Sequence, residues 1–331
     1  MAVKVEDLQN WLPVDAIIAD GRPALEWMDL RDLEFDEPFF AETVAQANTR
    51  QKVITDLDAL LQLEKIVDSV PLSGFIFHVS RCGSTLLANA CRKLTGSIVI
   101  AEAPVIDKIA ARFLTDSEQN SSKEMLYSLF LRAAIMALGQ RRKRDERFYF
   151  VKFACTSSLQ MSRIRRIWPE VPIVFLYRDP VEVIVSNMRS SPEWMQTNIH
   201  PGAAAAVAGV NLNEVDEISS EEFCARAVGR FLEEAEKNRS ENIKFVNYSQ
   251  LTPDSLVEAV EFLGATPTND EADAIRQVSR LYSKDSNRSR VFQSDSESKK
   301  ASASEHILRM AEKWALPYYE RLNKQPIKRG N

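Results

Sequence analysis

Short apolar runs alternate with longer helical patterns along most of this chain. The runs are rich in Val, Ile and Phe, as in buried strands, and the segments between them carry apolar residues at helical spacing. We predict five strands, at residues 75–79, 97–101, 147–153, 172–177 and 243–247. This alternation favours right-handed crossovers and a parallel sheet covered by helices on both faces, a three-layer α/β fold. Ligands of such sheets bind beyond the carboxyl ends of the strands.

Residues 1–70 do not follow this pattern. They contain five aromatic residues and then a helical pattern from about residue 41 to residue 67. Because so many aromatic residues argue against a disordered tail, we predict an N-terminal extension that packs on a core domain of residues 71–331. The extension either buttresses the core, the interpretation that we favour, or lines a substrate pocket.

Three other segments have simpler interpretations. Apolar residues at helical spacing predict an amphipathic helix over residues 219–240 and a last helix over about 303–323. The charged run at residues 141–147 predicts a solvated turn between a helix and a strand.

Composition narrows the class of protein only slightly. The chain has 331 residues, 45% of them hydrophobic, which is enough for one large core. The net charge of −5 does not favour bulk attraction to nucleic acid, so an anionic ligand would depend on local Arg and Lys side chains. The four cysteines show neither a C-x-x-C pair nor zinc-site spacing with the three histidines, and we interpret them as reduced thiols. The sequence has no apolar stretch of membrane-spanning length and no signal-peptide core, so we expect a cytoplasmic protein that does not act at a membrane.

The turn after the first core strand is basic and opens a helix. It resembles the phosphate loop G-x-x-x-x-G-K-S/T only in part: Gly83 and Thr85 fit, but His78 replaces the first Gly and Ser84 replaces the Lys. The positive charge stands instead at Arg81. Strand, tight turn and helix together aim backbone N–H groups at an anion, so we predict a phosphate site here.

A second basic position follows the fourth predicted core strand. That strand runs into Arg178, and the next residues suit a helix start: Asp179 as N-cap, Pro180 at the first helical position and Glu182 to complete a capping box. Ser186 lies two turns along this helix. An Arg at a strand's carboxyl end can bind a phosphate dianion through two parallel hydrogen bonds.

These two segments, in this order, resemble the sulfotransferases that use 3′-phosphoadenosine 5′-phosphosulfate (PAPS). The Arg-x-Gly-Ser-Thr form is similar to the tyrosylprotein and carbohydrate branches and to many bacterial relatives, and the resemblance spans residues 74–320. It implies a P-loop fold without a metal. It also implies that Arg178 and Ser186 hold the 3′-phosphate of the donor. The 5′-phosphosulfate would be held by the loop residues Arg81, Cys82, Gly83, Ser84 and Thr85.

The same resemblance implies three catalytic residues. Glu102 matches the general base of the tyrosylprotein branch, and partial burial would raise its pKa towards neutrality. Lys152 and Arg81 would neutralise the charge that develops on the leaving 5′-phosphate oxygen. Asp107 is the reserve candidate for the base, and we interpret His78 as a core side chain.

The Ser-rich basic segment at residues 282–300 is a plain loop by composition. In the family that the chain resembles, the equivalent region caps the donor, which makes Lys284, Arg288, Ser298 and Lys299 candidate phosphate ligands. The Arg-Lys-Gly closing motif of the cytosolic branch is absent from this chain.

Three functions therefore compete. A PAPS-dependent sulfotransferase would transfer a sulfuryl group to a hydroxyl or amine of a small-molecule, carbohydrate or peptide acceptor and release adenosine 3′,5′-bisphosphate (PAP). An ATP-dependent phosphotransferase is disfavoured by the missing loop Lys. A nucleotide-binding protein without catalysis would have Glu102 and Lys152 directed away from the donor.

Overall fold

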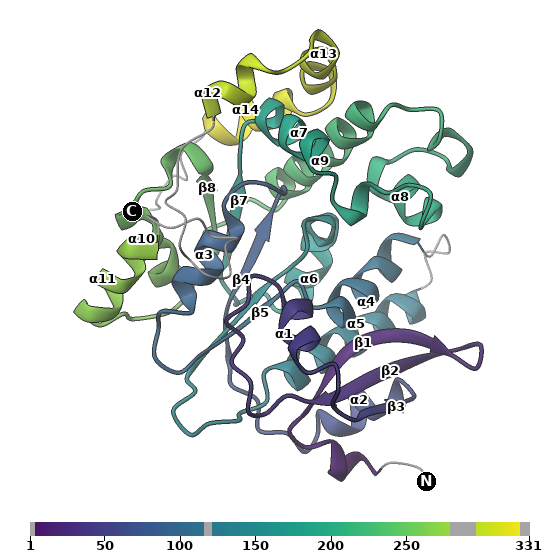
Figure 1. Cartoon of the computed structure of the whole chain (residues 1–331), viewed down its shortest axis with the longest axis vertical. Helices are drawn as coiled ribbons and strands as arrows, with labels where there is room; N and C mark the ends of the chain where they lie inside the picture. The colour runs from purple at the N-terminus through teal and green to yellow at the C-terminus, as the bar shows by residue number, and fades with distance from the viewer. Residues whose placement is uncertain (1–3, 116–120, 279–295, 325–331) are drawn as a thin grey trace.

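A five-stranded parallel sheet forms the centre of the protein. In the computed structural model, which describes residues 4–115, 121–278 and 296–324, the strand order is β5-β6-β4-β7-β8 (Figure 1). The strands are β4 (Leu72–His78), β5 (Ser97–Ala101), β6 (Phe148–Lys152), β7 (Ile173–Tyr177) and β8 (Ile243–Asn247). All neighbouring pairs are parallel. The five predicted strands and the predicted sheet are confirmed.

Helices cover both faces of this sheet. One layer holds α3 (Ser84–Cys91), which packs against α10 (Pro253–Phe262) and α11 (Asn269–Val278). The opposite layer holds α4 (Pro104–Thr115), α5 (Ser121–Leu138), η2 (Cys155–Gln160), α6 (Met161–Ile167) and α9 (Ser220–Lys237). From β4 the chain moves to β5 at one edge of the sheet, and the later strands, β6, β7 and β8, follow in the opposite direction. Because each crossover is right-handed, this change of direction places the first connecting helix on one face and the later ones on the other. This reversal opens a crevice at the carboxyl end of β4.

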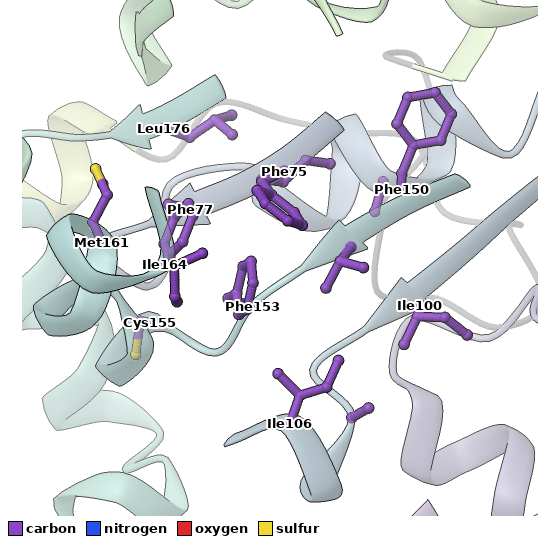
Figure 2. Packing of buried hydrophobic residues seen from close by; sticks show 14 of the residues in the cluster. Phe75, Phe77, Ile100, Ile106, Phe150, Phe153, Cys155, Met161, Ile164 and Leu176 are labelled. Atoms are coloured by element: carbon purple, nitrogen blue, oxygen red, sulfur yellow. The ribbon is translucent and has the colours of Figure 1, made fainter. Parts of the chain in front are cut away.

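Aromatic packing fixes the ends of β4 and β6 beside each other. Phe75 and Phe77 of β4 lie against Phe153, which follows β6 (Figure 2). The rings of Phe77 and Phe153 stack with their centroids 4.5 Å apart. All three side chains are fully buried, and each such burial stabilises the fold by roughly 1.5–3 kcal/mol. Strands buried on both faces explain the continuous apolar runs of the sequence.

A three-stranded antiparallel sheet forms much of the N-terminal extension. Its strands are β1 (Trp11–Ala19), β2 (Arg22–Asp29) and β3 (Lys52–Thr55), accompanied by η1 (Val5–Leu8), α1 (Phe40–Gln46) and α2 (Asp58–Leu63). Asp20 and Gly21, with φ of 50° and 75°, form the two-residue turn between β1 and β2. The predicted helix over residues 41–67 is wrong, because the β-branched residues of β3 pair with β2 and interrupt it. The boundary at residue 70 stays a prediction, since both parts share one buried apolar cluster.

Residues 143–145 of the charged run form an exposed turn, as predicted, but the flanking Arg142 and Glu146 side chains are buried. Arg142 and Glu146 form an ion pair at 3.2 Å with side chains only 4% and 5% exposed. The Arg142 guanidinium also lies 4.3 Å from the centre of the Phe35 ring and donates to the Leu33 carbonyl. The run therefore ties the N-terminal extension to the core, a contact between distant segments that composition could not reveal.

Several of the remaining helices pack against α9. The remaining helices are α7 (Pro180–Arg189), η3 (Glu193–Met195), α8 (Pro201–Ala208), η4 (Leu212–Glu214), η5 (Tyr248–Gln250), α12 (Ser296–Ala301), α13 (Glu305–Trp314) and α14 (Leu316–Lys324). The predicted helix over 219–240 is confirmed as α9. The predicted last helix is two helices, broken at Ala315 because Pro317 cannot continue a helix from the preceding turn. Among the residues that the structure describes, no helix has the length and apolar character needed to span a bilayer.

Candidate active site

The loop from β4 to α3 has an unusual backbone. Ser80, Arg81 and Gly83 all adopt positive φ, at 74°, 50° and 87°. For two non-glycine residues this conformation is strained, and such strain persists where the surroundings impose it, often at functional sites. A Cβ on Gly83 would meet Leu251 Cδ1 at 2.7 Å and the Tyr248 ring at 3.2 Å, so only glycine fits there. The loop is therefore held in a single tight shape.

The first turn of α3 has no cap from its N-cap side chain. Gly83 is the N-cap and has no side chain to accept from the leading N–H groups, and the Ser84 N–H faces the Cys82 sulfur. Ser84 and Thr85 are buried at 6% and 5% exposure, and within the described residues their hydroxyls have no hydrogen-bond partner. An uncapped helix start with two adjacent hydroxyls suits an anion such as a phosphate.

Both predicted arginines meet this loop. Arg81 reaches α7, where Nε donates to Asn187 Oδ1 at 3.2 Å and Nη2 donates to the Ser190 carbonyl at 2.7 Å. Arg178 Nη1 donates to the backbone carbonyl of Arg81 at 3.3 Å. Arg178 therefore contacts the backbone of the loop, whereas the Arg81 guanidinium lies against the end of α7. Cys82 is fully buried, and burial raises the pKa of its thiol to about 11, so it is not a reactive cysteine.

Arg178 is buried and strongly oriented. Its Nε donates to Glu182 Oε2 at 2.6 Å, and its guanidinium lies 4.0 Å from the centre of the Tyr248 ring. The predicted capping box is wrong in one respect: Asp179 caps α7 through the Val181 N–H, but Glu182 binds Arg178 instead of closing the box. A charge-assisted hydrogen bond to a guanidinium is stronger than a bond to a neutral backbone N–H.

The other residues predicted to bind phosphate lie in different parts of the chain, and some lie outside the described residues. Ser186 is half-buried on α7. Lys284 and Arg288 lie outside the described residues. Ser298 lies in α12, where its side chain is not described, and Lys299 is buried in the same helix. Lys300 was not predicted as a ligand, and its Nζ lies 2.7 Å from Asp179 Oδ2.

Glu102 meets two basic side chains at the carboxyl ends of the strands. It follows β5 with φ of 54°, a third strained non-glycine residue in this region. Its Oε1 pairs with Lys152 Nζ and lies 3.4 Å from His78 Nε2. Burial alone would raise the pKa of Glu102, but the Lys152 ammonium and His78 outweigh it and hold the pKa at about 2. The prediction that burial brings this carboxyl towards neutrality is therefore wrong.

His78 links the strained loop to Glu102. Its Nδ1 accepts the Ser80 N–H at 3.1 Å, so the proton is on Nε2, which faces Glu102. Burial lowers the pKa of His78, which stays neutral at physiological pH. His78 is buried as predicted, but its position between the loop and a carboxylate was missed because alternation within a strand says nothing about neighbours.

Asp107 lies one turn into α4, and among the described residues its hydrogen bonds all go to one carboxylate oxygen. Its Oδ1 accepts the Ala154 N–H at 3.2 Å and the Ser157 hydroxyl at 3.1 Å. Burial and the nearby charge of Glu102 raise the pKa of Asp107 to about 7. The two carboxyls therefore differ strongly in proton affinity, as in acid–base pairs whose environments push their pKa values apart.

A cavity of about 510 Å³ opens beside these two carboxyls. Its walls come from α4, η2, η3, α8 and the start of α1, and they are mostly apolar. The apolar lining includes Phe39, Pro104, Ala110, Trp194, Ala204 and Val207. Phe39 also lies over Lys152, with Nζ 4.9 Å from the ring centre. The N-terminal extension thus buttresses the core through Arg142 and also lines a pocket, although the sequence favoured only the first role.

No group of three or more potential metal ligands occurs among His, Cys, Asp and Glu side chains of residues 4–115, 121–278 and 296–324. No protein-family model matches the chain, and no curated protein matches it either.

Several solved structures are distantly similar to this chain. The sulfotransferase STF9 from Mycobacterium avium is 11% identical with a TM-score of 0.45, covering 87% of this chain and 84% of its own. The sulfotransferase domain of the Synechococcus PCC 7002 olefin synthase is 14% identical with a TM-score of 0.41, covering 78% and 97%. Retinol dehydratase in complex with androsterone and PAP is 15% identical with a TM-score of 0.40, covering 85% and 89%. Likenesses at this level assign neither an activity nor residue roles to this chain.

Proposed function

We propose that this protein transfers a sulfuryl group from PAPS to a hydroxyl or amine of an acceptor. One observation carries the proposal: the strained basic loop is joined through His78 to the Glu102–Lys152 pair, and Glu102 lines the cavity. The third alternative, a binding protein without catalysis, expected Glu102 and Lys152 to face away from such a site. Their adjacency to the loop favours an enzyme.

The donor would lie along the loop. The uncapped amides of α3 with Ser84 and Thr85 suit the 5′-phosphate, and Arg178 suits the 3′-phosphate. Glu182 already neutralises Arg178, so binding of a phosphate dianion would require the guanidinium to share its donors between the two anions. Ser186, Lys299 and the candidates outside the described residues stay predictions for the same phosphate.

Transfer would proceed in line. The acceptor oxygen or nitrogen attacks sulfur, the bond from sulfur to the 5′-phosphate oxygen breaks, and its electron pair leaves with PAP. Arg81 and Lys152 would stabilise the charge that grows on this leaving oxygen, which is positioning and electrostatics rather than covalent catalysis. A carboxylate, Glu102 or Asp107, would take the acceptor's proton, since both line the cavity.

The cavity indicates a small, largely apolar acceptor. A volume of about 510 Å³ is typical of a small-molecule site, and the mostly apolar walls offer few partners to the many hydroxyls of a carbohydrate. A buried polar group without a partner costs free energy, so sugars would bind poorly. We therefore place phenols and alcohols with an apolar body ahead of carbohydrates and peptides.

Calorimetric titration with PAP and with ATP tests the donor, each with and without Mg²⁺. We expect PAP to bind without Mg²⁺ and more tightly than ATP. The phosphotransferase alternative would gain if ATP bound more tightly and only with Mg²⁺.

Turnover of radiolabelled PAPS over apolar phenols, aliphatic alcohols, amines, sugars and tyrosyl peptides tests the reaction. We expect Arg81→Ala to lose roughly 10²-fold in kcat, by analogy with removal of an oxyanion donor. Arg309→Ala, which removes an exposed guanidinium on α13, is the matched control and should keep wild-type turnover. Absence of sulfuryl transfer to every acceptor class, despite PAP binding, would favour the binding protein.

A further inference from the structure

Glu102 and Asp107 both line the cavity, and their surroundings give them different roles. We infer that Asp107 accepts the proton of the acceptor, whereas Glu102 holds Lys152 in position. This inference rests on the proposed sulfuryl transfer. It departs from the resemblance, which assigns the proton to Glu102.

Glu102 is held by ionic and polar contacts with its basic neighbours. Its Oε1 receives the Lys152 ammonium, which is 1% exposed and so has little access to water. His78 Nε2 faces the same oxygen at 3.4 Å. Protonating this carboxylate would leave a buried ammonium without its counter-charge, which is strongly unfavourable. Glu102 is thus well suited to stay ionised throughout the reaction and poorly suited to take up a proton.

Asp107 is oriented but not neutralised. The Ala154 N–H and the Ser157 hydroxyl both bind Oδ1, and Oδ2 has no hydrogen-bond partner among the described residues. The carboxyl lines the same cavity as Glu102, so Oδ2 is available to a hydroxyl bound there. A positioned carboxyl with one open oxygen is the geometry that a general base needs.

The charges around Asp107 reinforce this difference. The charges of Glu102 and Lys152, at the ends of β5 and β6, affect the pKa of Asp107. Neutral His78, at the end of β4, contacts Glu102, and buried Cys155 of η2 is also close to Asp107. The other ionisable groups of the cavity are Lys108 on α4, which pairs with Asp15, and Glu193 and His200 on the outer wall. Burial and Glu102 together raise the pKa of Asp107 to about 7, close to a working pH, whereas the pKa of Glu102 is about 2. A base is most effective when its pKa lies near the operating pH.

In the transfer step, the acceptor O–H bond breaks as the O–S bond forms, and the proton passes to Asp107 Oδ2. The electron pair of the breaking S–O bond leaves with PAP. Lys152, held by Glu102, faces the charge on that departing oxygen. Asp107 then releases its proton to water before the next turnover.

The pH dependence of kcat separates this role from a structural one. We expect wild-type kcat to fall with unit slope below about pH 7, and Asp107→Asn to lose this limb together with roughly 10²–10⁴-fold in rate. Asp107→Glu should keep a limb at a shifted pH. Glu102→Gln should lose rate but keep the limb, moved to lower pH because the charge that opposes ionisation of Asp107 is gone. Asp273→Asn, on an exposed position of α11, is the control and should match wild type.

Acceptor acidity provides a second readout. For Asp107→Asn the loss should be large with an aliphatic alcohol and small with 4-nitrophenol, which ionises readily and needs little help from a base. PAP titration of each variant checks that the folded donor site persists. The inference is overturned if Asp107→Asn keeps the acid limb, or if its loss is the same for both acceptors. Absence of PAP binding or of sulfuryl transfer in the wild-type protein would instead overturn the proposed function.

Discussion

Asp107→Asn should stabilise the protein at alkaline pH, and this prediction tests the unusual ionisation directly. The folded protein holds the Asp107 proton up to a pKa of about 7, whereas the unfolded chain releases it near the ordinary value of 3.8. Between these values the folded state binds more protons than the unfolded state, so stability is lost as the pH rises towards 7. Asn cannot ionise, and its carbonyl can still accept from Ala154 and Ser157.

The magnitude follows from the two pKa values. Each unit of difference corresponds to about 1.4 kcal/mol, so ionised Asp107 lowers the free energy of unfolding by about 4 kcal/mol above pH 7. Near pH 4.5 most of this penalty is absent, because folded Asp107 is protonated there. The stability of Asp107→Asn relative to wild type should therefore increase by about 3 kcal/mol between pH 4.5 and pH 8.

Urea unfolding followed by tryptophan fluorescence measures this difference, with wild type, Asp107→Asn and Asp273→Asn compared at both pH values. The exposed Asp273 pairs with a surface arginine, so the free energy of unfolding of its variant should stay within about 0.5 kcal/mol of wild type. A stability difference for Asp107→Asn that does not change with pH would refute the raised pKa. The assignment of Asp107 as the proton acceptor would then lose its energetic support.

Three further predictions concern the donor site, the cavity and the fold. Arg178→Lys should weaken PAP binding roughly tenfold in calorimetry, because Lys keeps the charge but loses the planar fork; unchanged affinity would remove Arg178 from the 3′-phosphate site. Trp194→Ala should raise KM for an apolar acceptor roughly tenfold while PAP affinity stays constant, since Trp194 lines the cavity; an equal change in PAP affinity would contradict a separate acceptor site. Glu146→Gln should lower the free energy of unfolding in urea by about 3–5 kcal/mol, because it leaves Arg142 buried without its partner. Glu34→Gln is the exposed control, and a loss similar to that of Glu146→Gln would show that burial is not the cause.

Much of the core fold follows from local patterns. The runs around Phe75, Val99, Phe150 and Val174 are continuous and apolar because β4 to β7 are buried on both faces, so their strands could be predicted one at a time. The basic loop at Arg81 was equally visible, since a strand, a turn and a helix start are neighbours in sequence.

The N-terminal extension shows where local patterns fail. β3 is four residues long and alternates only weakly, and its place in a sheet depends on pairing with β2, some twenty-five residues earlier in the chain. The Asp20–Gly21 pair is typical of a two-residue hairpin turn and could have predicted the pairing of β1 with β2. The prediction of a long helix after this segment did not take that pair into account.

The sequence by itself determined which residue types could hold an anion and roughly where they stand along the chain. Only the tertiary structure decided which of them meet: Lys152 with Glu102, Arg178 with the loop backbone at Arg81, and Asp107 with an apolar cavity. Proton affinity depends on burial and on charges a few ångströms away, and these neighbours come from strands far apart in the chain. For that reason two carboxyls five positions apart can have such different pKa values, and a residue list cannot tell them apart.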